Sequence, residues 1–462
     1  MSNSLDFWNP RSAMHVIAVD VPELGNRAHL VHDGARALVV DAPRDWRPLE
    51  LAAESAGVDI VAVADTHVHN DYLSGGLGLA TRHRADYWLS GDERVQFDRL
   101  PTHDGDLLDV GRLRVRVLST PGHTLHHQTF VVGDPRSGET GVFSGGSLLH
   151  GTVGRTDLVD PLLSRMMGRA QWESARKVAS LDAAATLHPT HGFGGMCAAT
   201  ATSPVGQGTV GDERGLNPAL VTPRDRFVEE LVAGFGPVPS YYRRMGRLNR
   251  AGAGAAATLP PTEITENDVL DAVRRGSWVI DLRPRATFAR AHLTGSINIE
   301  DGPLFAQYAA WLAPWGGDIV LISDSADDLS SGVHDLAQVG VQVRATHLLG
   351  PASTWFDSHD YRVADWATYA RSARGSVTLD VRLDAEYHDA HLPESFHVPL
   401  HELEGAASRL PDGQVWVHCK SGFRAAIAAS LLARAGRDVV LIADDWEKIA
   451  DQGLPVLRGR AA

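Results

Sequence analysis

The C-terminal half of the chain contains an internal repeat, which restricts it to folds that two copies of one module can build. The segment VIDLRPRATFARAHLTGSINI at 279–299 is similar to TLDVRLDAEYHDAHLPESFHV at 378–398. Three polar residues recur at an offset of 99 residues: Asp281 and Asp380, Arg283 and Arg382, and His292 and His391. This shared spacing predicts two tandem copies of one α/β module.

The region before the repeat has a different pattern. Residues 12–200 alternate β-like apolar runs with helix-like ones, which predicts an α/β fold with layered sheets. The Ala/Gly/Pro-rich run NRAGAGAAATLPP at 249–261 has no periodicity and is typical of a linker. Because 462 residues are too many for one ordinary core, we predict three domains, at 1–248, 262–368 and 369–462.

Charge and composition exclude several classes of function. The formal net charge of −14 argues against nucleic acid or an anionic membrane as the main partner. No apolar run approaches the roughly 18 residues needed to cross a bilayer, and the N-terminus has no pattern of a signal peptide. The two cysteines, Cys197 and Cys419, cannot form a disulfide framework and suit a reducing compartment, so we expect a cytoplasmic protein.

Cys419 begins a short loop between an apolar strand and an Ala/Leu-rich helix, in VWVHCKSGFRAAIAASLLARAG at 415–436. The free N–H groups and dipole at a helix N-terminus stabilise an anion. Lys420 and Arg424 add positive charge to the same loop. The sequence therefore predicts a reactive cysteine that favours the thiolate form, rather than a buried structural one.

The loop CKSGFR resembles the active loop of the rhodanese family of sulfurtransferases, and DVR…EY…AHLPES…VP at 380–399 resembles that family too. The resemblance implies that Cys419 carries a sulfane sulfur as a persulfide and that Arg424 assists it. The remaining loop residues implied to surround the sulfur are Lys420, Ser421, Gly422 and Phe423. Cysteine phosphatases have five residues between cysteine and arginine, whereas this loop has four, which favours a single sulfur over a phosphate.

The first copy of the repeat lacks this loop. Its segment IVLISDSADDLSS places Ser323 or Asp324 opposite the cysteine, and no Gly-x-Arg follows. Without a thiol there is nothing to carry sulfur, and acidic residues repel an anion. We predict that the first copy is a catalytically inactive spacer or docking module.

A group of potential metal ligands lies in VDIVAVADTHVHNDYLSGG at 58–76, where His67, His69, Asp71 and Tyr72 follow an apolar run. His123 follows a Pro-Gly turn in LSTPGHTLHH, and His191 lies in TLHPTHGFGGMC. Because a rigid sheet fixes the loops at its strand ends, we expect these histidines to converge on one ion.

In order and spacing these motifs resemble the metallo-β-lactamase superfamily, which implies an αβ/βα sandwich. Joined to tandem rhodanese modules, the chain resembles persulfide dioxygenase–rhodanese fusions. In those enzymes two histidines and an aspartate hold one iron. The histidines match His67 and His123, but Gly146 in FSGGSL stands where the aspartate would be. Tyr72 replaces the last histidine of the opening motif, so a two-metal hydrolase lacks two ligands.

We expect His67, His69 and His123 to form a set of three imidazoles that holds one Fe(II), with Zn(II) or a metal-free vestige as alternatives. The residues expected beside the ligands, where they orient ligands or hold a water, are Asp71, Tyr72 and His191. Cys197 is either a buried apolar residue or a thiol that accepts or relays sulfur. Arg155 and Asp157 are either an internal salt bridge or a substrate contact.

The resemblance implies a sulfur-metabolising enzyme. The N-terminal domain would oxidise a low-molecular-weight persulfide, such as glutathione persulfide, with O₂ to sulfite. Cys419 would transfer sulfane sulfur between a persulfide, sulfite and thiosulfate. Two alternatives stay open: a sulfurtransferase whose N-terminal domain is a metal-poor persulfide-binding scaffold, and a sulfur-carrier or interaction protein. A homo-oligomer also stays open.

Overall fold

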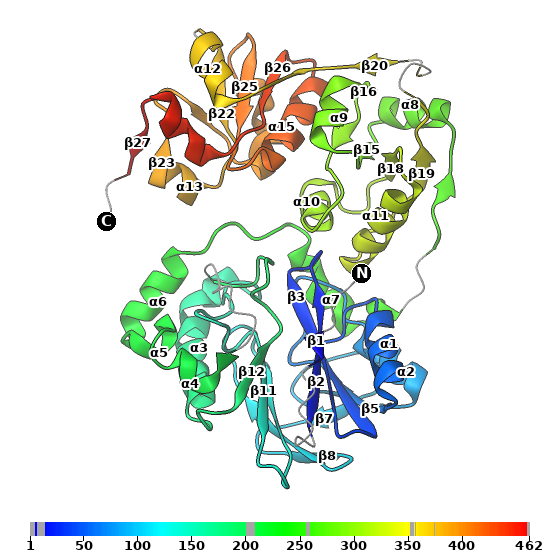
Figure 1. Cartoon of the computed structure of the whole chain (residues 1–462), viewed down its shortest axis with the longest axis vertical. Helices are drawn as coiled ribbons and strands as arrows, with labels where there is room; N and C mark the ends of the chain where they lie inside the picture. Colours follow the sequence, from blue (N-terminus) through cyan, green and yellow to red (C-terminus); the bar gives the residue numbers. More distant parts are fainter. Residues whose placement is uncertain are drawn as a thin grey trace. The chain divides into compact units, whose positions relative to one another are not determined.

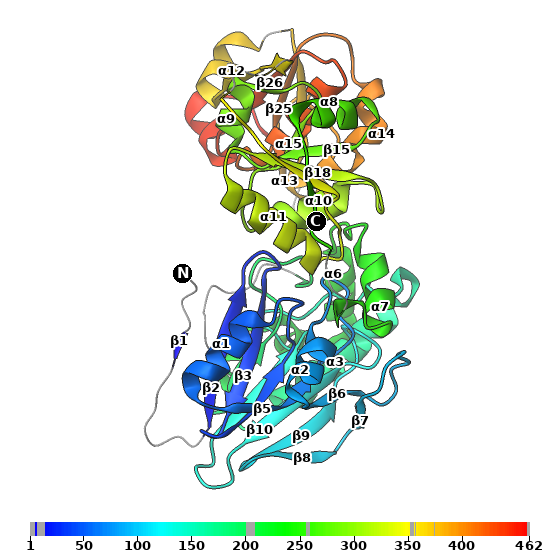
Figure 2. The same ribbon diagram turned by 90° about the vertical axis from the view of Figure 1, so that its right-hand side faces the viewer.

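The computed structural model describes residues 5–6, 14–199, 208–255, 259–351, 355, 357–373 and 375–459. The chain divides into two compact units, one comprising residues 1–258 and 338–340 and the other residues 259–337 and 341–462. Figure 1 and Figure 2 show the elements of each unit from two directions. No helix among the described residues is long and apolar enough to cross a membrane.

The first unit is built on two sheets (Figure 1). The seven-stranded sheet has the order β1 (Leu5–Asp6), β2 (His15–Val21), β3 (Asn26–His32), β4 (Arg36–Val40), β5 (Asp59–Ala64), β6 (Asp86–Ser90) and β7 (Leu100–Thr102). The six-stranded sheet has the order β13 (Gly208–Thr209), β12 (Thr186–Pro189), β11 (Thr140–Gly145), β10 (Gln128–Gly133), β9 (Leu113–Ser119) and β8 (Leu107–Val110).

Helices cover the outer faces of both sheets. Those along the first part of the unit are α1 (Arg47–Ala56) and α2 (Gly76–His83). Those along the later part are η1 (Pro161–Leu163), α3 (Ser164–Ala179), α4 (Val210–Glu213), α5 (Pro218–Val221), α6 (Arg224–Ala233), α7 (Tyr242–Arg250) and η2 (Ala253–Ala255).

Period-two alternation in the strands separates three hydrophobic clusters. In β4, Val39 packs outward with Leu49 of α1, while Leu38 faces inward with Phe130 of β10. A third cluster packs the outer face of the six-stranded sheet against α3 and α6. Three clusters between helices, sheet, sheet and helices are the arrangement of an αβ/βα sandwich, which confirms the predicted fold class.

The sandwich brings the loops that carry the predicted site residues to strand ends. β5 ends at Ala64, just before the opening histidine motif. β9, β11 and β12 run in one direction, because β9 and β11 are both antiparallel to β10 and β12 is parallel to β11. Their carboxyl ends, which precede His123, Gly146 and His191, therefore lie at one edge of the six-stranded sheet.

The second unit contains two five-stranded parallel sheets with the same strand order. The first sheet is β14 (Thr262–Glu263), β19 (Ala345–Leu348), β18 (Ile319–Ser323), β15 (Trp278–Asp281) and β17 (Ile297–Asn298). The second is β21 (Arg362–Ala364), β26 (Val439–Ile442), β25 (Val415–His418), β22 (Val377–Asp380) and β24 (Phe396–His397). Two-stranded sheets pair β16 (His292–Leu293) with β20 (Ser358–His359) and β23 (Ala390–His391) with β27 (Leu457–Arg458).

The helices of this unit follow the same repeat. In the first copy they are α8 (Glu266–Arg274), α9 (Arg285–Arg290), α10 (Phe305–Leu312) and α11 (Ala326–Gln338). In the second they are α12 (Trp366–Ser372), α13 (Asp384–Asp389), η4 (Leu400–Glu402), α14 (Leu403–Ala406), η5 (Ala407–Arg409), α15 (Phe423–Arg434) and η6 (Trp446–Gln452).

The repeated polar residues occupy equivalent places in the two copies. Arg283 donates through Nη2 to the Oδ2 of Asp281 at 2.6 Å, and Arg382 does the same to Asp380 at 2.6 Å. All four side chains are at least 95% buried. Asp281 ends β15 and Asp380 ends β22, the strand beside the central one in each sheet. The buried guanidinium and carboxylate of each pair neutralise each other. The internal repeat predicted from the sequence is therefore confirmed in the structure.

Two predicted boundaries differ from the observed elements. The predicted linker at 249–261 begins inside α7 and includes η2. The helix continues to Arg250 because the buried Asn249 donates to the carbonyl oxygens of His69 and Tyr72. Residues 256–258 lie outside the described residues. The second rhodanese-type copy begins with β21 at Arg362, before the predicted boundary at 369, because β21 pairs with β26. A strand of three residues has too short a pattern to be recognised from sequence alone.

We expect Asp380→Asn to destabilise the second unit, because it leaves the buried guanidinium of Arg382 without its counter-charge. Breaking a buried pair in this way costs about 3 kcal/mol. Urea unfolding followed by tryptophan fluorescence would measure the loss. The control is Asp271→Asn, which removes an exposed partner of Arg274 and should leave the unfolding midpoint nearly unchanged. Equal midpoints for the two variants would contradict this account.

Candidate metal centre and reactive cysteine loop

Asp41 joins the loops that carry the histidines of the first unit. It follows β4, is 1% exposed, and has a left-handed backbone with φ of 56°. Its Oδ1 accepts from the backbone N–H of Thr66 at 2.6 Å, and its Oδ2 accepts from the hydroxyls of Thr66 and Thr190. These contacts connect the loop after β5 with the loop after β12. Sequence reasoning missed Asp41, because a lone aspartate after a strand carries no distinctive pattern.

Three imidazoles meet beside this network. The nearest ring nitrogens of His67, His123 and His191 lie within 4.8 Å of one another, and all three residues are buried. The Nε2 atoms of His67 and His191 are 3.4 Å apart. Within the described part of the chain, the Nε2 of His123 has no hydrogen-bond partner.

The other nitrogen of each imidazole is held by a fixed acceptor. The Nδ1–H of His123 donates to the carbonyl oxygen of Arg155 at 2.8 Å. The Nδ1–H of His191 donates to Asn26 Oδ1 at 2.9 Å, and that of His67 to the Thr66 hydroxyl at 2.9 Å. All three Nε2 atoms therefore present lone pairs to the same small space, which is how histidines are oriented around a metal ion.

The electrostatics of the three imidazoles keep them neutral. Burial lowers the pKa of His67 and His123 well below the usual value, and neighbouring histidines lower both further. Burial also lowers the pKa of His191. Because a protonated imidazole cannot bind a metal, neutral rings are the competent form. Three inward lone pairs without a proton between them fit a divalent cation.

His69 is arranged differently from the other three. Its Nε2 lies 2.9 Å from the Tyr72 hydroxyl and 3.3 Å from Asp41 Oδ1. Burial alone lowers the pKa of His69, but Asp41, Asp65 and Asp71 together raise it above the usual value. The ring is thus paired with a carboxylate. The structure groups His191 with His67 and His123, in the place that the sequence analysis expected for His69.

A second group of potential ligands overlaps the first. His69 Nδ1 and Asp71 Oδ1 are both buried, lie 4.0 Å apart and have no hydrogen-bond partner among the described residues. Together with His191 they form another set whose ligand atoms lie within 4.8 Å. Asp71 is fixed by Asn26, whose Nδ2 donates to its Oδ2 at 2.7 Å. Asp71 and Tyr72 therefore stand beside the imidazoles, as expected of residues that orient ligands.

Gly146 has no room for a side chain. A Cβ built there would lie 2.3 Å from Cδ2 of His123, whose ring rests on the bare backbone. At Gly154, on the other side, a Cβ would lie 2.5 Å from Nδ1 of the same ring. The His123 ring therefore occupies the space where the resemblance led us to look for a carboxylate.

His127 also borders the cluster, and sequence reasoning missed it. Its ring stacks on that of His67 with centroids 5.0 Å apart, and its Nε2 accepts from the backbone N–H of Gly146 at 3.0 Å. Burial lowers the pKa of His127 to about 3, so it is a neutral acceptor. The run TLHHQ at 124–128 offered the signal, since His126 and His127 both follow the Gly-His motif.

Cys197 and Arg155 have mainly structural contacts. The Cys197 thiol is buried, lies 3.8 Å from the Tyr242 hydroxyl, and has its pKa raised well above the usual value by burial and by Asp71. It is therefore a neutral thiol in the free protein. Arg155 forms a bidentate ion pair with Asp157 at 2.7 Å for both bonds, while its backbone carbonyl holds His123. The salt-bridge interpretation of Arg155 and Asp157 is the one the structure shows.

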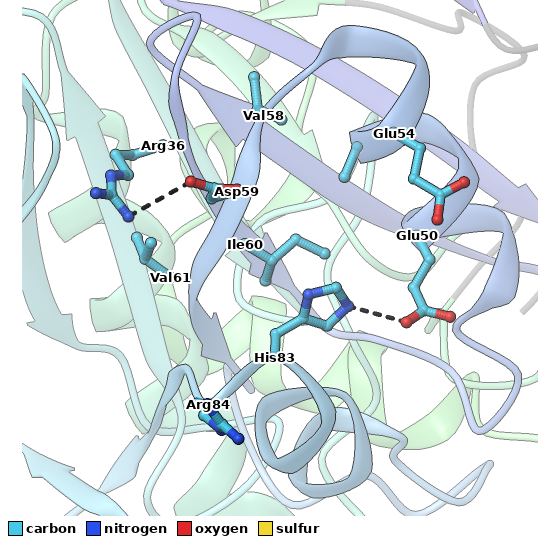
Figure 3. A pocket seen from close by; sticks show the side chains of 10 residues that line it. Arg36, Glu50, Glu54, Val58, Asp59, Ile60, Val61, His83 and Arg84 are labelled. Atoms are coloured by element: carbon cyan, nitrogen blue, oxygen red, sulfur yellow. Dashed lines mark hydrogen bonds and ion pairs between the residues drawn. The ribbon is translucent and has the colours of Figure 1, made fainter.

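A surface hollow of about 420 Å³ lies elsewhere in the first unit (Figure 3). It is lined by the end of α1, the start of β5 and the end of α2. Its charges are largely paired, with Arg36 3.7 Å from Asp59 and His83 2.9 Å from Glu50. Because His67 follows the opposite end of β5, this hollow is not part of the metal centre.

In the second unit, Cys419 lies between β25 and α15, as predicted. Its sulfur is buried and accepts from the backbone N–H of Gly422 at 3.2 Å. Gly422 has φ of 88°, a left-handed conformation that suits glycine and turns the loop into the helix. The carbonyl oxygen of Lys420 accepts from the backbone N–H of Trp446 at 2.8 Å, which ties the loop to the start of η6.

Arg424 is held by a partner that the sequence analysis missed. Its Nη1 and Nη2 donate to the two carboxylate oxygens of Glu386 at 2.5 and 2.8 Å. Glu386 lies in α13, 38 residues earlier in the chain. A bidentate pair fixes the plane of the guanidinium. The arginine at the helix start is thus oriented by the segment EYHDAHLPES.

Strand register decides which residue replaces the cysteine in the first copy. Asp281 pairs with Ile322, and Asp380 with His418, so Ser323 is equivalent to Cys419. Counting on from there, Asp328 stands in the place of Arg424. The Ser323 hydroxyl donates to Asp328 at 3.2 Å. The first copy therefore has an alcohol and a negative charge where the second has a thiol and a positive one.

Comparisons with known proteins agree with this architecture. Residues 265–351 and 364–452 match the rhodanese-like domain family. The chain is 35% identical over 117 residues to a hydroxyacylglutathione hydrolase of Rhodopseudomonas palustris (strain HaA2), covering 24% of this chain and 45% of the relative. It is 31% identical over 163 residues to that of Dechloromonas aromatica (strain RCB), covering 35% and 54%. The chain thus spans about half the length of these curated relatives.

Solved structures show the fold. A metallo-beta-lactamase from Staphylococcus aureus subsp. aureus COL is 23% identical with a TM-score of 0.66, covering 74% of this chain and 100% of the other. ETHE1 from Myxococcus xanthus is 25% identical with a TM-score of 0.43, covering 51% and 97%. The chain therefore consists of an N-terminal region of the metallo-β-lactamase fold followed by two rhodanese-like domains.

Proposed function

We propose that this protein is a cytoplasmic sulfur-metabolising enzyme with two sites, a persulfide dioxygenase and a thiosulfate sulfurtransferase. The observation that carries the proposal is the Cys419 loop, where the sulfur meets a backbone N–H at the start of a 12-residue helix. Such a position stabilises negative charge on sulfur. The rhodanese-like domain match supports the same chemistry.

The transfer step at Cys419 follows from this geometry. The thiolate attacks the outer sulfur of thiosulfate, a new S–S bond forms, and the old S–S bond breaks with its electron pair leaving on sulfite. Cys419 then bears a persulfide anion, which a second thiolate or cyanide attacks in turn. The Gly422 N–H stabilises the charged sulfur, while the Arg424–Glu386 pair holds the loop.

The first unit fits a mononuclear metal site held by His67, His123 and His191, whose ligand nitrogens lie within 4.8 Å of one another. Among the described residues the Nε2 of His123 has no hydrogen-bond partner. When bound, Fe(II) would supply a centre at which a low-molecular-weight persulfide reacts with O₂; Zn(II) fits the same ligands. The overall reaction takes one persulfide, one O₂ and one water to a thiol and sulfurous acid. The protein's own part is to keep the imidazoles neutral and oriented in a site without bulk water.

The two activities are linked by chemistry. Sulfite, the product of the first, is an acceptor for the persulfide sulfur on Cys419, and their combination gives thiosulfate. A persulfide such as glutathione persulfide would supply the first reaction. The hydrolase activity in the names of the curated relatives fits less well, because two-metal hydrolysis needs a bridging carboxylate and Gly146 provides none.

Cys419→Ala should abolish sulfur transfer from thiosulfate to cyanide while O₂ consumption with glutathione persulfide continues. The reason is that the variant removes the only thiol at the α15 loop and touches nothing in the first unit. Thiocyanate formation and an oxygen electrode would measure the two activities on the same preparation. Loss of both activities would contradict the division of labour.

His191→Ala should reduce bound iron to below about a tenth of the wild-type content, because it removes one of three inward nitrogens. His69→Gln should retain more iron, since the Nε2 of His69 is engaged by Tyr72 and Asp41. Elemental analysis after anaerobic loading with Fe(II) would compare them. The control is His103→Ala, an exposed histidine. A larger loss of iron in His69→Gln than in His191→Ala would favour the ligand set expected from the sequence. If the wild-type protein binds no metal, Cys419 is left as the only proposed active site.

Gly146→Asp should weaken iron binding, although it installs the carboxylate of iron-binding relatives. Its Cβ would clash with the His123 ring, so one ligand would be displaced as another is added. Gly133→Asp is a matched control, because the nearest atom to a Cβ there is 3.7 Å away. Iron titration followed by competition with a chelator would compare the affinities. Tighter binding in Gly146→Asp would show that the His123 ring can move aside.

A further inference from the structure

Helix α10 of the first rhodanese-like copy supplies aromatic rings to the second. The ring of Tyr308 meets Phe423 edge-on with centroids 5.4 Å apart. One turn later, Trp311 stacks on His401 with centroids 4.9 Å apart. Phe423 belongs to the Cys419 loop itself. The inactive copy therefore borders the reactive loop of the active one.

A second contact fixes this arrangement at the loop backbone. Arg285 of α9 donates through Nη1 to the carbonyl oxygen of Ser421 at 2.9 Å. Arg285 is itself paired with Glu300, with its Nε 3.1 Å from the carboxylate. A Cβ at Gly422 would lie only 2.9 Å from this Nη1, so the glycine allows the close approach. The two copies are thus held together at the residues that follow Cys419.

The phenol of Tyr308 lies in the electrostatic environment of the site. It interacts with the charges of Arg424, Cys419 and Glu386. Tyr308 is 9% exposed, and burial raises its pKa to about 12. At neutral pH the side chain is therefore an uncharged O–H donor close to the Cys419 loop.

Within the first copy, Tyr308 has no reactive loop to serve. Ser323 and Asp328 cannot carry a sulfane sulfur or attract an anion. If α10 takes part in the chemistry, it does so at the loop of the second copy, whose proposed substrates carry negatively charged oxygen or sulfur atoms.

We propose that Tyr308 is a specificity-determining residue of the Cys419 site, and that its hydroxyl donates a hydrogen bond to the anionic oxygens of a sulfonate-type sulfur donor such as thiosulfate. This inference rests on the proposed sulfur transfer at Cys419. When the S–S bond of thiosulfate breaks, the electron pair goes to the leaving sulfite, and the Tyr308 O–H stays bonded to a sulfite oxygen without transferring its proton. The first copy is then part of the active site rather than a spacer.

The test is Tyr308→Phe in the full chain, which keeps the ring against Phe423 and removes only the hydroxyl. With thiosulfate and cyanide, we expect the KM for thiosulfate to rise about tenfold, as for a lost hydrogen bond to a charged group, while kcat changes little. A purely structural role would not produce this split. Tyr361→Phe, which removes a buried hydroxyl without a partner among the described residues, is the matched control and should resemble the wild type.

A binding measurement separates this inference from the proposed function. In a Cys419→Ser background, which cannot turn over, calorimetry with thiosulfate should give about tenfold weaker binding when Tyr308→Phe is added. Unchanged KM and unchanged affinity in Tyr308→Phe would overturn the inference. If the wild-type chain shows no sulfur transfer at all, the proposed function fails, and the calorimetric comparison still decides whether Tyr308 binds the anion.

Discussion

The buried carboxylate of Asp41 is the contact on which the metal centre depends. It is reached by donors from Thr66, Thr190 and His69, which come from two loops separated by more than a hundred residues. Burial raises the pKa of this carboxyl, but the charge of His69 and these hydrogen bonds bring it below the usual range. An ionised group in that position holds both loops by charge-assisted hydrogen bonds. It thereby ties the loops that follow β5 and β12, which carry the imidazoles, to the end of β4.

The absence of a carboxylate at Gly146 and the position of the His123 ring have the same steric cause. The ring lies between the backbones of Gly146 and Gly154, at distances that exclude a Cβ on either. Its Nδ1 is fixed by a carbonyl, and its Nε2 has no hydrogen-bond partner in the part of the chain that the structure describes. The site therefore offers neutral nitrogen ligands, which lowers its net negative charge compared with a carboxylate-containing site. Such a set suits a divalent ion of borderline softness.

The two rhodanese-like copies show how one scaffold can carry opposite loops. The Asp–Arg pair, at the end of β15 in one copy and of β22 in the other, has the same geometry in both, so the backbone around it is equivalent. What differs is the residue at the strand end and the charge five positions later. Cys419 and Arg424 favour an anion, whereas Ser323 and Asp328 repel one. The scaffold thus survives without the chemistry, because its stability rests on the buried pair and the core rather than on the loop.

The sequence by itself determined the repeat, the cysteine loop and the placing of histidines at strand ends, because each is a local pattern of spacing and polarity. The alternation of β-like and helix-like runs also predicted an α/β fold with layered sheets, and the resemblance to the metallo-β-lactamase superfamily implied the αβ/βα sandwich. Only the tertiary structure decided that the ligand nitrogen of His191, rather than that of His69, forms one group with those of His67 and His123. It also decided that Asp41, Glu386 and Tyr308 border the sites. These facts depend on contacts between distant segments, and on which ring nitrogen each hydrogen bond occupies. No local pattern carries that information, because side-chain orientation is set by the partners that folding brings together.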